Sequence, residues 1–294
     1  MNSIKLALPL IAALACGPSQ AWAASILDPE LSSFAVLGSS TVTNVPPSTI
    51  SGNVGVWSSN GANAITGFNS SPGVPVFDAQ VTDGQVHAGT ASAQSAQGQL
   101  DNAIVNLALM GPGTVLGADL NGLTLTPGVY TVAAGTSNLT GTLTLDGQGN
   151  ANAAWVFQMA SSLITSSGSL VTLINTGSDA GIFWDVRSSA TLGTGTTFLG
   201  NILALSSITL NTGASIGCGS ALAHTGAVTL ASNAISTGCG GGILVDGGTP
   251  TFLPDAPLSA VPEPETGSML LAGLGMLGLI LRRNRQVRRQ PESL

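Results

Sequence analysis

The sequence predicts a mainly β protein whose short strands stack as the coils of a solenoid, with one long helix along its side. Three observations predict this class. Glycine accounts for 39 of 294 residues and aromatic residues for only 4%, which favours many short strands joined by tight turns. A Thr-Leu motif recurs with a period near 20 residues. One segment alone shows helical periodicity. A β-sandwich with similar turn spacing is the alternative.

The repeat begins each time with Thr-Leu, continues with small polar residues and returns to an aliphatic residue. Leu192, Leu210 and Leu230 lie 18 and 20 residues apart. A coil of this length cannot bury its apolar residues alone, but stacked coils can. The period therefore favours the solenoid over the sandwich. The three clearest copies are TLGTGTTFLGNIL (191–203), TLNTGASIGCGSAL (209–222) and TLASNAISTGCGGGI (229–243).

A helix is predicted at about 83–110, within a segment rich in Ala, Gln and Leu. Thr82 or Asp83 can cap its start, and the Gly-Pro-Gly of 111–113 ends it. In a solenoid such a helix would lie along the flank and cover one sheet. Its apolar face recurs at intervals of three and four residues through Val86, Ala93, Ala96, Leu100, Ile104 and Leu107.

Charge is scarce, because charged residues make up 7% of the chain and the net charge is −7. Between Lys5 and Arg282 the only basic residue is Arg187. Nucleic-acid binding needs clustered Lys and Arg, so that function is excluded, and polyphosphate binding is disfavoured on the same ground.

The N-terminus predicts export. Residues 1–23 have a positive start at Lys5, a short apolar core and a small-residue cleavage site, and so read as a signal peptide. Lipoprotein processing at Cys16 is the alternative. We expect the folded domain to span 24–243 and a Pro- and Gly-containing linker to span 244–260.

The C-terminal stretch 261–289 has three parts: a Pro-Glu-Pro sequence at Pro262, Glu263 and Pro264, an uncharged run at 266–281, and an arginine cluster. By itself this pattern indicates a transmembrane helix that anchors the chain. In this order the parts closely resemble the PEP-CTERM sorting signal. That resemblance implies an exosortase-type processing enzyme and surface display or release by a Gram-negative, exopolysaccharide-producing cell.

Two cysteines follow the predicted signal peptide, Cys218 and Cys239, which are 21 residues apart. In an exported protein such a pair is usually bridged, and a bridge one coil long would staple the last two coils. Two unpaired thiols are the alternative.

We find no catalytic or metal-binding constellation in the sequence. The acidic residues are mostly solitary, and the nearest approach to a cluster is Asp179, Asp185 and Arg187. Asp185 and Arg187 read as a surface ion pair. Neither His87 nor His224 has a nucleophile or zinc-type spacing beside it. We therefore expect no enzyme, no metal and no cofactor.

Hydroxyl residues instead recur from coil to coil. Stacked strands would set equivalent residues about 4.7–4.9 Å apart in rows, so rows of threonine would offer methyl and hydroxyl groups at a fixed repeat. The alternative reading is that threonine simply favours strands. The recurring residues include Thr41, Thr43, Thr66, Thr140, Thr142, Thr194, Thr196, Thr197, Thr212 and Ser215.

From about residue 31 to 236 the sequence closely resembles the microbial ice-binding proteins, in strings such as FAVLGSSTVTN, GLTLTPGVY, LTGTLTLDGQGN and FWDVRSSATLGTGTTFLGNILALSSITLNTGAS. The resemblance implies a right-handed, discontinuous β-solenoid of roughly triangular cross-section in which the first and last parts of the chain interleave. It also implies a monomer that binds ice through one flat face without a cofactor.

The family's loose motif, Thr-(Ala/Gly)-x-(Thr/Asn), matches 66–69 and 194–197 and departs at Ser215 in 212–215. The resemblance thus implies seven ice-binding residues: Thr66, Asn69, Thr194, Thr196, Thr197, Thr212 and Ser215.

We accordingly predict an exported protein that adsorbs to ice and acts in antifreeze or in inhibition of ice recrystallisation. The alternative is a surface or matrix adhesin that binds exopolysaccharide on the same scaffold. Rows of aromatic residues would suit sugars, but Trp57, Trp155 and Trp184 are isolated in the sequence, which favours ice.

Overall fold

A computed structural model describes residues 26–59, 63–241, 245–246 and 249–250. The predicted signal peptide, the Pro-Glu-Pro motif and the 266–281 run lie outside the described residues. Within them, no helix is both long and apolar enough to cross a membrane. Most of the predicted linker is also outside, apart from a two-stranded antiparallel pair, β24 (Val245–Asp246) and β25 (Thr249–Pro250).

The chain is mainly β, as predicted, and its strands form three sheets in which every neighbouring pair is parallel. In spatial order, sheet A contains β7 (Val86–Ala88), β4 (Asn53–Val56), β1 (Phe34–Gly38), β21 (Ala221–Ala223), β18 (Asn201–Ala204), β15 (Gly181–Val186), β12 (Ala154–Met159), β10 (Gly128–Val132) and β8 (Thr114–Leu116). Sheet B contains β13 (Leu163–Ile164), β16 (Ala190–Leu192), β19 (Ile208–Leu210), β22 (Val228–Ala231), β2 (Thr41–Val45) and β5 (Ala64–Thr66). Sheet C contains β6 (Val81–Thr82), β3 (Thr49–Ser51), β23 (Ala234–Ser236), β20 (Ser215–Ile216), β17 (Thr197–Phe198), β14 (Leu170–Ile174), β11 (Thr142–Asp146) and β9 (Thr124–Leu125).

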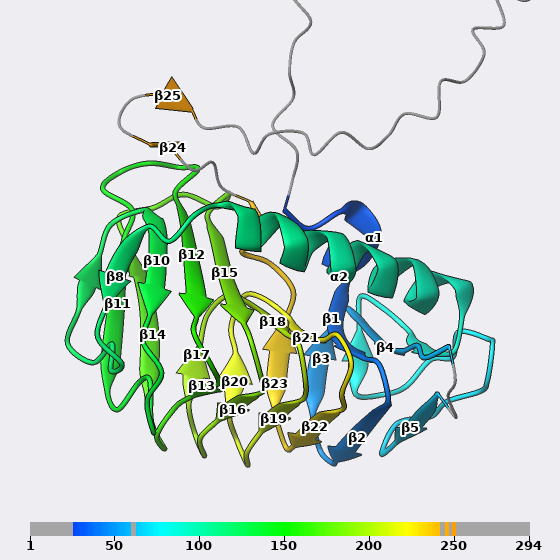
Figure 1. Cartoon of the computed structure of the whole chain (residues 1–294). Helices are drawn as coiled ribbons and strands as arrows, with labels where there is room; N and C mark the ends of the chain where they lie inside the picture. The colour runs from blue at the N-terminus through cyan, green and yellow to red at the C-terminus, as the bar shows by residue number, and fades with distance from the viewer. Residues whose placement is uncertain (1–25, 60–62, 242–244, 247–248, 251–294) are drawn as a thin grey trace, which may run out of the picture. The chain divides into compact units, whose positions relative to one another are not determined.

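Each complete coil contributes one strand to each sheet in turn, as β15, β16 and β17 do. The solenoid prediction is therefore confirmed. The coils do not stack in chain order, because strands from the first and last parts of the chain are neighbours in all three sheets (Figure 1). β1 pairs with β21, β2 with β22 and β3 with β23. The predicted interleaving is thus present.

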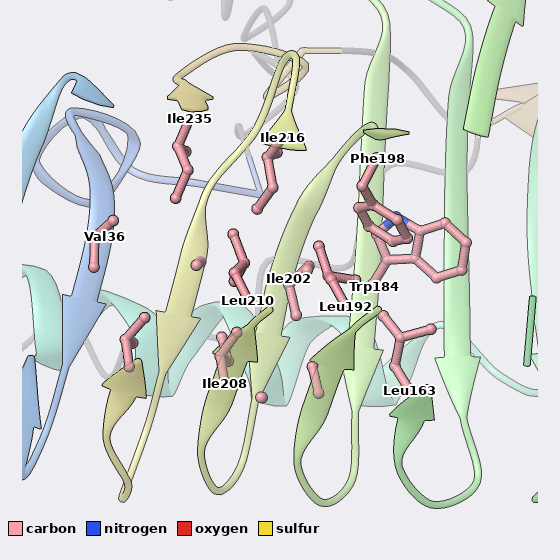
Figure 2. Packing of buried hydrophobic residues seen from close by; sticks show 14 of the residues in the cluster. Val36, Leu163, Trp184, Leu192, Phe198, Ile202, Ile208, Leu210, Ile216 and Ile235 are labelled. Carbon is pink, nitrogen blue, oxygen red and sulfur yellow. The ribbon is translucent and has the colours of Figure 1, made fainter. Parts of the chain in front are cut away.

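The core lies between the three sheets and is filled by the inward residues of each strand. Figure 2 shows Leu192 and Leu210 of sheet B, Phe198 of sheet C and Trp184 and Ile202 of sheet A pointing into it. Its largest side chains pack on one another. Phe157 and Trp184, from adjacent coils, stack with ring centroids 4.0 Å apart, and Trp184 lies 4.9 Å from Phe198 of its own coil. Burial of each such side chain stabilises the fold by about 1.5–3 kcal/mol, so the stacked coils gain stability that one coil lacks.

Helix α2 (Ala91–Leu109) runs along the outer side of sheet A, following the short helix α1 (Pro29–Ser32) and β1–β7 in the chain (Figure 1). Its predicted apolar face is buried there from Ala93 onward, in a second hydrophobic layer with Leu37, Val156, Phe183, Leu203 and Leu222, whereas Val86 lies in β7. Its start is later than predicted. The Thr90 side chain caps the helix by accepting from the Ala93 N–H. Residues 81–82 and 86–88 are strands instead, because they pair with β3 and β4 at the end of the solenoid.

The structure joins Cys218 and Cys239 by a disulfide, with 5.4 Å between their Cα atoms. The Ile182 N–H and the Asn201 amide both donate to the Cys239 carbonyl, at 3.0 and 2.8 Å. The disulfide and these bonds hold the segment after β23 against the strands of sheet A.

Candidate functional site

The outer faces of the three sheets differ in what covers them. Sheet A is covered by α2, which packs on β1, β4, β7, β12 and β15. Neither described helix packs in this way on sheet B or sheet C. Any extended surface for a flat ligand must therefore lie on sheet B or sheet C.

Sheet B carries five threonines in one outward row, which we call the threonine ladder. Thr191 pairs with Thr209, and Thr209 pairs with Thr229. Thr229 pairs with Thr43, and Thr43 pairs with Thr66. Because parallel strands lie about 4.7–4.9 Å apart, these five side chains repeat at that spacing across five neighbouring strands.

Strand alternation sets the orientation of the ladder. The residue before each rung points inward and is buried, and so are Leu192, Leu210 and Leu230 after three of the rungs, while the rung threonines remain at least partly exposed. No hydroxyl of the five makes a hydrogen bond to another residue that the structure describes. These hydroxyls are therefore left for a ligand or solvent.

The surroundings of the ladder are small and uncharged. No strand of sheet B contains an acidic or basic residue. A second outward row lies two residues earlier in each coil. Thr41 and Ala64 pair at the start of β2 and β5, and Ser189, Ser207 and Ala227 directly precede β16, β19 and β22. Sheet B therefore presents adjacent rows of methyl and hydroxyl groups on a hydrogen-bonded sheet.

Sheet C is less regular. Its corresponding row brings together Thr197 and Ser215, but Leu170 precedes them and Ala234 follows them. Leu170 and Ile174 are 37% and 40% exposed, and Asp146 adds a charge at the end of β11. Other hydroxyl rows on sheet C, such as Thr124, Thr144 and Thr172, extend over three strands, whereas the threonine ladder of sheet B is continuous over five.

The seven residues predicted as ice-binding do not share one surface. Thr66 belongs to the ladder, whereas Thr197 and Ser215 lie on sheet C. Thr194 and Thr212 are exposed in the turns between sheets B and C. Asn69 lies in the loop after β5, where its N–H donates to Asp78 at 2.6 Å.

Thr196 is fully buried, so the prediction that it faces a ligand does not fit the structure. It lies at the corner between sheets B and C. Its hydroxyl contacts the Thr165 hydroxyl at 2.9 Å and donates to the Ser166 carbonyl at 3.2 Å. Its role is to satisfy buried polar groups of the neighbouring coil.

Four rungs were absent from the predicted set: Thr43, Thr191, Thr209 and Thr229. The signal for three of them was present in the repeat itself. Each copy begins with Thr-Leu, and alternation that buries the leucine must expose the threonine.

The charged residues give no catalytic constellation among the described residues. Asp185 and Arg187 form the expected ion pair at 2.7 Å, but Asp185 is fully buried rather than on the surface. Burial raises the pKa of Asp185, and the nearby Arg187 opposes that rise. Within the described part of the chain, no three acidic, His or Cys residues gather as a metal site.

A model of ice-binding-like proteins matches residues 36–236, which is most of the chain. The chain belongs to the ice-binding-like family. The predicted family and the absence of an enzymatic role are thereby confirmed, since this is a family of ice-binding proteins rather than enzymes. A model of the PEP-CTERM protein-sorting motif matches residues 260–286, as predicted from the Pro-Glu-Pro sequence.

Ice-binding proteins are also among the individual relatives. An ice-binding protein of Nostoc sp. (strain HG1) is 43% identical over 252 residues, covering 85% of this chain and 83% of the relative. An ice-binding protein of Flavobacterium frigoris (strain PS1) is 33% identical over 214 residues, covering 69% of this chain and 73% of the relative.

Solved structures of this family support the fold. An ice-binding protein from the Antarctic ascomycete Antarctomyces psychrotrophicus is similar with a TM-score of 0.59 at 32% identity, covering 71% of this chain and 97% of that one. A glycosylated ice-binding protein from an Arctic yeast gives a TM-score of 0.64 at 29% identity, covering 74% of this chain and 96% of that one.

Proposed function

We propose that this protein binds ice through the outer face of sheet B, with the threonine ladder at its centre. The single observation that carries the proposal is the continuous row of five threonines across five neighbouring strands. Ice is an extended lattice, so a binding surface must present many weak contacts at a fixed repeat. The ladder supplies such a repeat, and the family and its named relatives point to the same ligand.

The stiffness of the face supports this function. Each rung belongs to a strand paired on at least one side, and the residue before it in the chain is packed in the core. A surface that is already ordered loses little conformational entropy on binding, so weak contacts can add to useful adsorption. We infer that adsorption restrains ice growth and recrystallisation.

Polysaccharide binding has no comparable support. Trp155 and Trp184 are fully buried in the core, and Trp57 is partly buried beside the helix layer. Within the described residues, tryptophan therefore forms no exposed platform on which sugar rings could stack. We propose no second function.

The decisive test replaces an inner rung of the ladder, the second of the five. In Thr209→Tyr, a bulky ring would stand above the flat face and hold the ice lattice away from the other rungs. We expect loss of most thermal hysteresis and recrystallisation inhibition, with a change in stability within about 0.5 kcal/mol, because the side chain is on the surface.

Thr172→Tyr on sheet C is the matched control, since it places the same ring on the neighbouring face. We expect it to retain activity. Full activity in Thr209→Tyr, or loss in Thr172→Tyr alone, would show that sheet B is not the ice-binding face.

We also propose that the protein is exported through the inner membrane of a Gram-negative bacterium. The support is the signal-like sequence 1–23 together with the sorting motif at 260–286. In this proposal the apolar run 266–281 holds the chain in the membrane only until an exosortase-type enzyme acts near Pro262, Glu263 and Pro264. The protein would then work as a monomer at the cell surface or in the matrix around the cell.

A further inference from the structure

The threonine ladder crosses a junction between two distant parts of the chain. Thr191, Thr209 and Thr229 come from the last coils, whereas Thr43 and Thr66 come from the first. The rungs on either side of the junction, Thr229 and Thr43, pair without a short connection between their strands. Something other than chain connectivity must therefore set the register there.

A buried polar residue lies directly behind the junction. In sheet B the inward row of leucines ends at Leu230, whose partner on β2 is Asn44. Asn44 is only 5% exposed, and a buried amide is costly unless it is hydrogen-bonded. Its amide donates to the Gln80 side chain at 3.0 Å and to the Gly67 carbonyl at 3.3 Å. Its oxygen accepts from the Ser48 hydroxyl at 2.7 Å.

Ser48 connects this amide to the last coil. Its hydroxyl accepts from the Asn233 N–H at 3.0 Å, a bond between residues 185 positions apart. The Thr49 N–H donates to the Asn233 carbonyl at 2.8 Å. Ser48 and Asn233 are 4% and 2% exposed, so water does not replace these bonds cheaply. One hydroxyl thus joins the first and last parts of the chain inside the corner between sheets B and C.

The network reaches the strand of every rung near the junction. The Asn233 side chain donates to the carbonyl of Asn211, two residues after Thr209, and accepts from the N–H of Ala231, two residues after Thr229. Asn44 directly follows Thr43, and its acceptor Gly67 directly follows Thr66. A slip of one residue at β2 would turn Thr43 inward and would also break these bonds.

We propose that Asn44, Ser48 and Asn233 are positioning residues that bring the first-coil rungs, Thr43 and Thr66, into register with the last-coil rungs. This role rests on the proposed ice-binding face. It extends that function to three buried residues that touch no ice and act through the ladder.

The experiment compares the two ends of the ladder with and without the bridging hydroxyl. Thr66→Ala removes the terminal rung of the first coils, and Thr191→Ala removes the terminal rung of the last coils. Each change is made in the natural chain and in Ser48→Ala, and recrystallisation inhibition is measured over a concentration series.

We expect both rung changes to weaken activity in the natural chain. In Ser48→Ala, activity should already be reduced, Thr66→Ala should add no further loss, and Thr191→Ala should still weaken what remains. If Ser48 had a purely structural role, Thr66→Ala and Thr191→Ala would instead weaken the activity of Ser48→Ala equally. Complete loss of activity in Ser48→Ala would also support the proposal, provided that Thr196→Val keeps its activity.

Thr196→Val is the matched control, because it removes another fully buried hydroxyl from the same corner but within consecutive coils. Ser48→Thr should restore activity, since it keeps the hydroxyl. If Ser48→Ala does not fold, Gln80→Ala replaces it, because the partly exposed Gln80 side chain accepts from both Asn44 and the Ser48 N–H.

The proposal would be overturned if folded Ser48→Ala, or Gln80→Ala where that variant takes its place, kept the activity of the natural chain. It would also be overturned if Thr66→Ala weakened that variant as much as it weakens the natural chain. Thr209→Tyr separates this result from failure of the proposed function. Activity that survives Thr209→Tyr refutes the face and this role together. Activity lost in Thr209→Tyr but intact in Ser48→Ala refutes the positioning role alone.

Discussion

His87 is buried beside the start of α2, in contact with the hydroxyl that caps the helix. Its Nδ1 lies 3.1 Å from the Thr90 hydroxyl, which also accepts from the Ala93 N–H. Which atom donates in the contact between Nδ1 and the hydroxyl depends on the tautomer of the ring. Burial lowers the pKa of His87, although the negative charge of Glu30 partly opposes the shift. His87 thus couples the helix cap to pH.

We expect stability to fall as the pH drops below 6.5, the ordinary pKa of the residue. The unfolded chain binds the proton more readily than the folded one, so His87 stabilises the fold fully above that pKa. Its contribution is lost as the pH falls toward the lowered pKa of the folded state, at no more than about 1.4 kcal/mol per pH unit. Urea unfolding of the natural chain and of His87→Asn, between pH 5 and 8, measures this difference. Equal slopes for the two proteins would contradict the assignment.

The same residue type serves opposite purposes according to its place in a coil. Thr191 and Thr196 stand five positions apart, yet one faces outward on β16 and the other is buried at the corner. Composition shows that threonine recurs but not which copies turn outward. That depends on where each strand ends and the corner begins. The Thr-Leu dipeptide indicates which threonines face outward, because a leucine in the core fixes the orientation of its neighbour.

At the scale of elements, the coil repeat and the helix could be predicted, whereas the helix start could not. Val86 fits the apolar period of α2, but it pairs with Val54 as part of β7. The partner strand of β7 lies some thirty residues earlier, and the sequence around Val86 does not indicate that pairing. The local apolar periodicity therefore predicts a helix that begins before Thr90, the residue that caps α2.

The disulfide between Cys218 and Cys239 is the element-scale prediction. A closed loop with a sequence separation of 21 is worth about 3 kcal/mol on the chain-entropy model, and Cys218→Ser/Cys239→Ser should lose stability of that order. Ice activity near 0 °C should remain, because neither cysteine lies on sheet B. Chemical unfolding and alkylation of unreduced exported protein test the two statements. Thiols that react without reduction would show that the bridge does not form.

The whole chain combines an acidic folded domain with an arginine-rich tail, which carries the match to the sorting motif. Between residues 26 and 241 the one basic residue other than histidine is Arg187, so electrostatic attraction to anionic lipid is weak. We therefore expect protein recovered from the medium or matrix to end near Pro262–Thr266, as intact-mass analysis would show. In a host without the processing enzyme, the full chain should remain with membranes.

Removal of 261–294 is the control for that prediction. The truncated chain should be recovered in soluble form with unchanged ice activity, because the last ladder residue in the sequence, Thr229, lies well before the deleted segment. Mature protein that still carries Arg282–Arg289 in a producing cell would instead indicate a permanent anchor.

The pairing of first and last coils also dictates when this molecule can fold. Strands β1–β7 are synthesised first. However, β1, β2 and β3 each pair on one edge with β21, β22 and β23, which are synthesised near the end of the domain. Such long-range pairing slows folding, since a loop of nearly the whole domain must close before the contacts form. A chain with this topology stays without its complete native structure until synthesis is nearly finished. In the proposed export, such a chain would enter a membrane pore before it is folded and would complete its binding surface only on the far side.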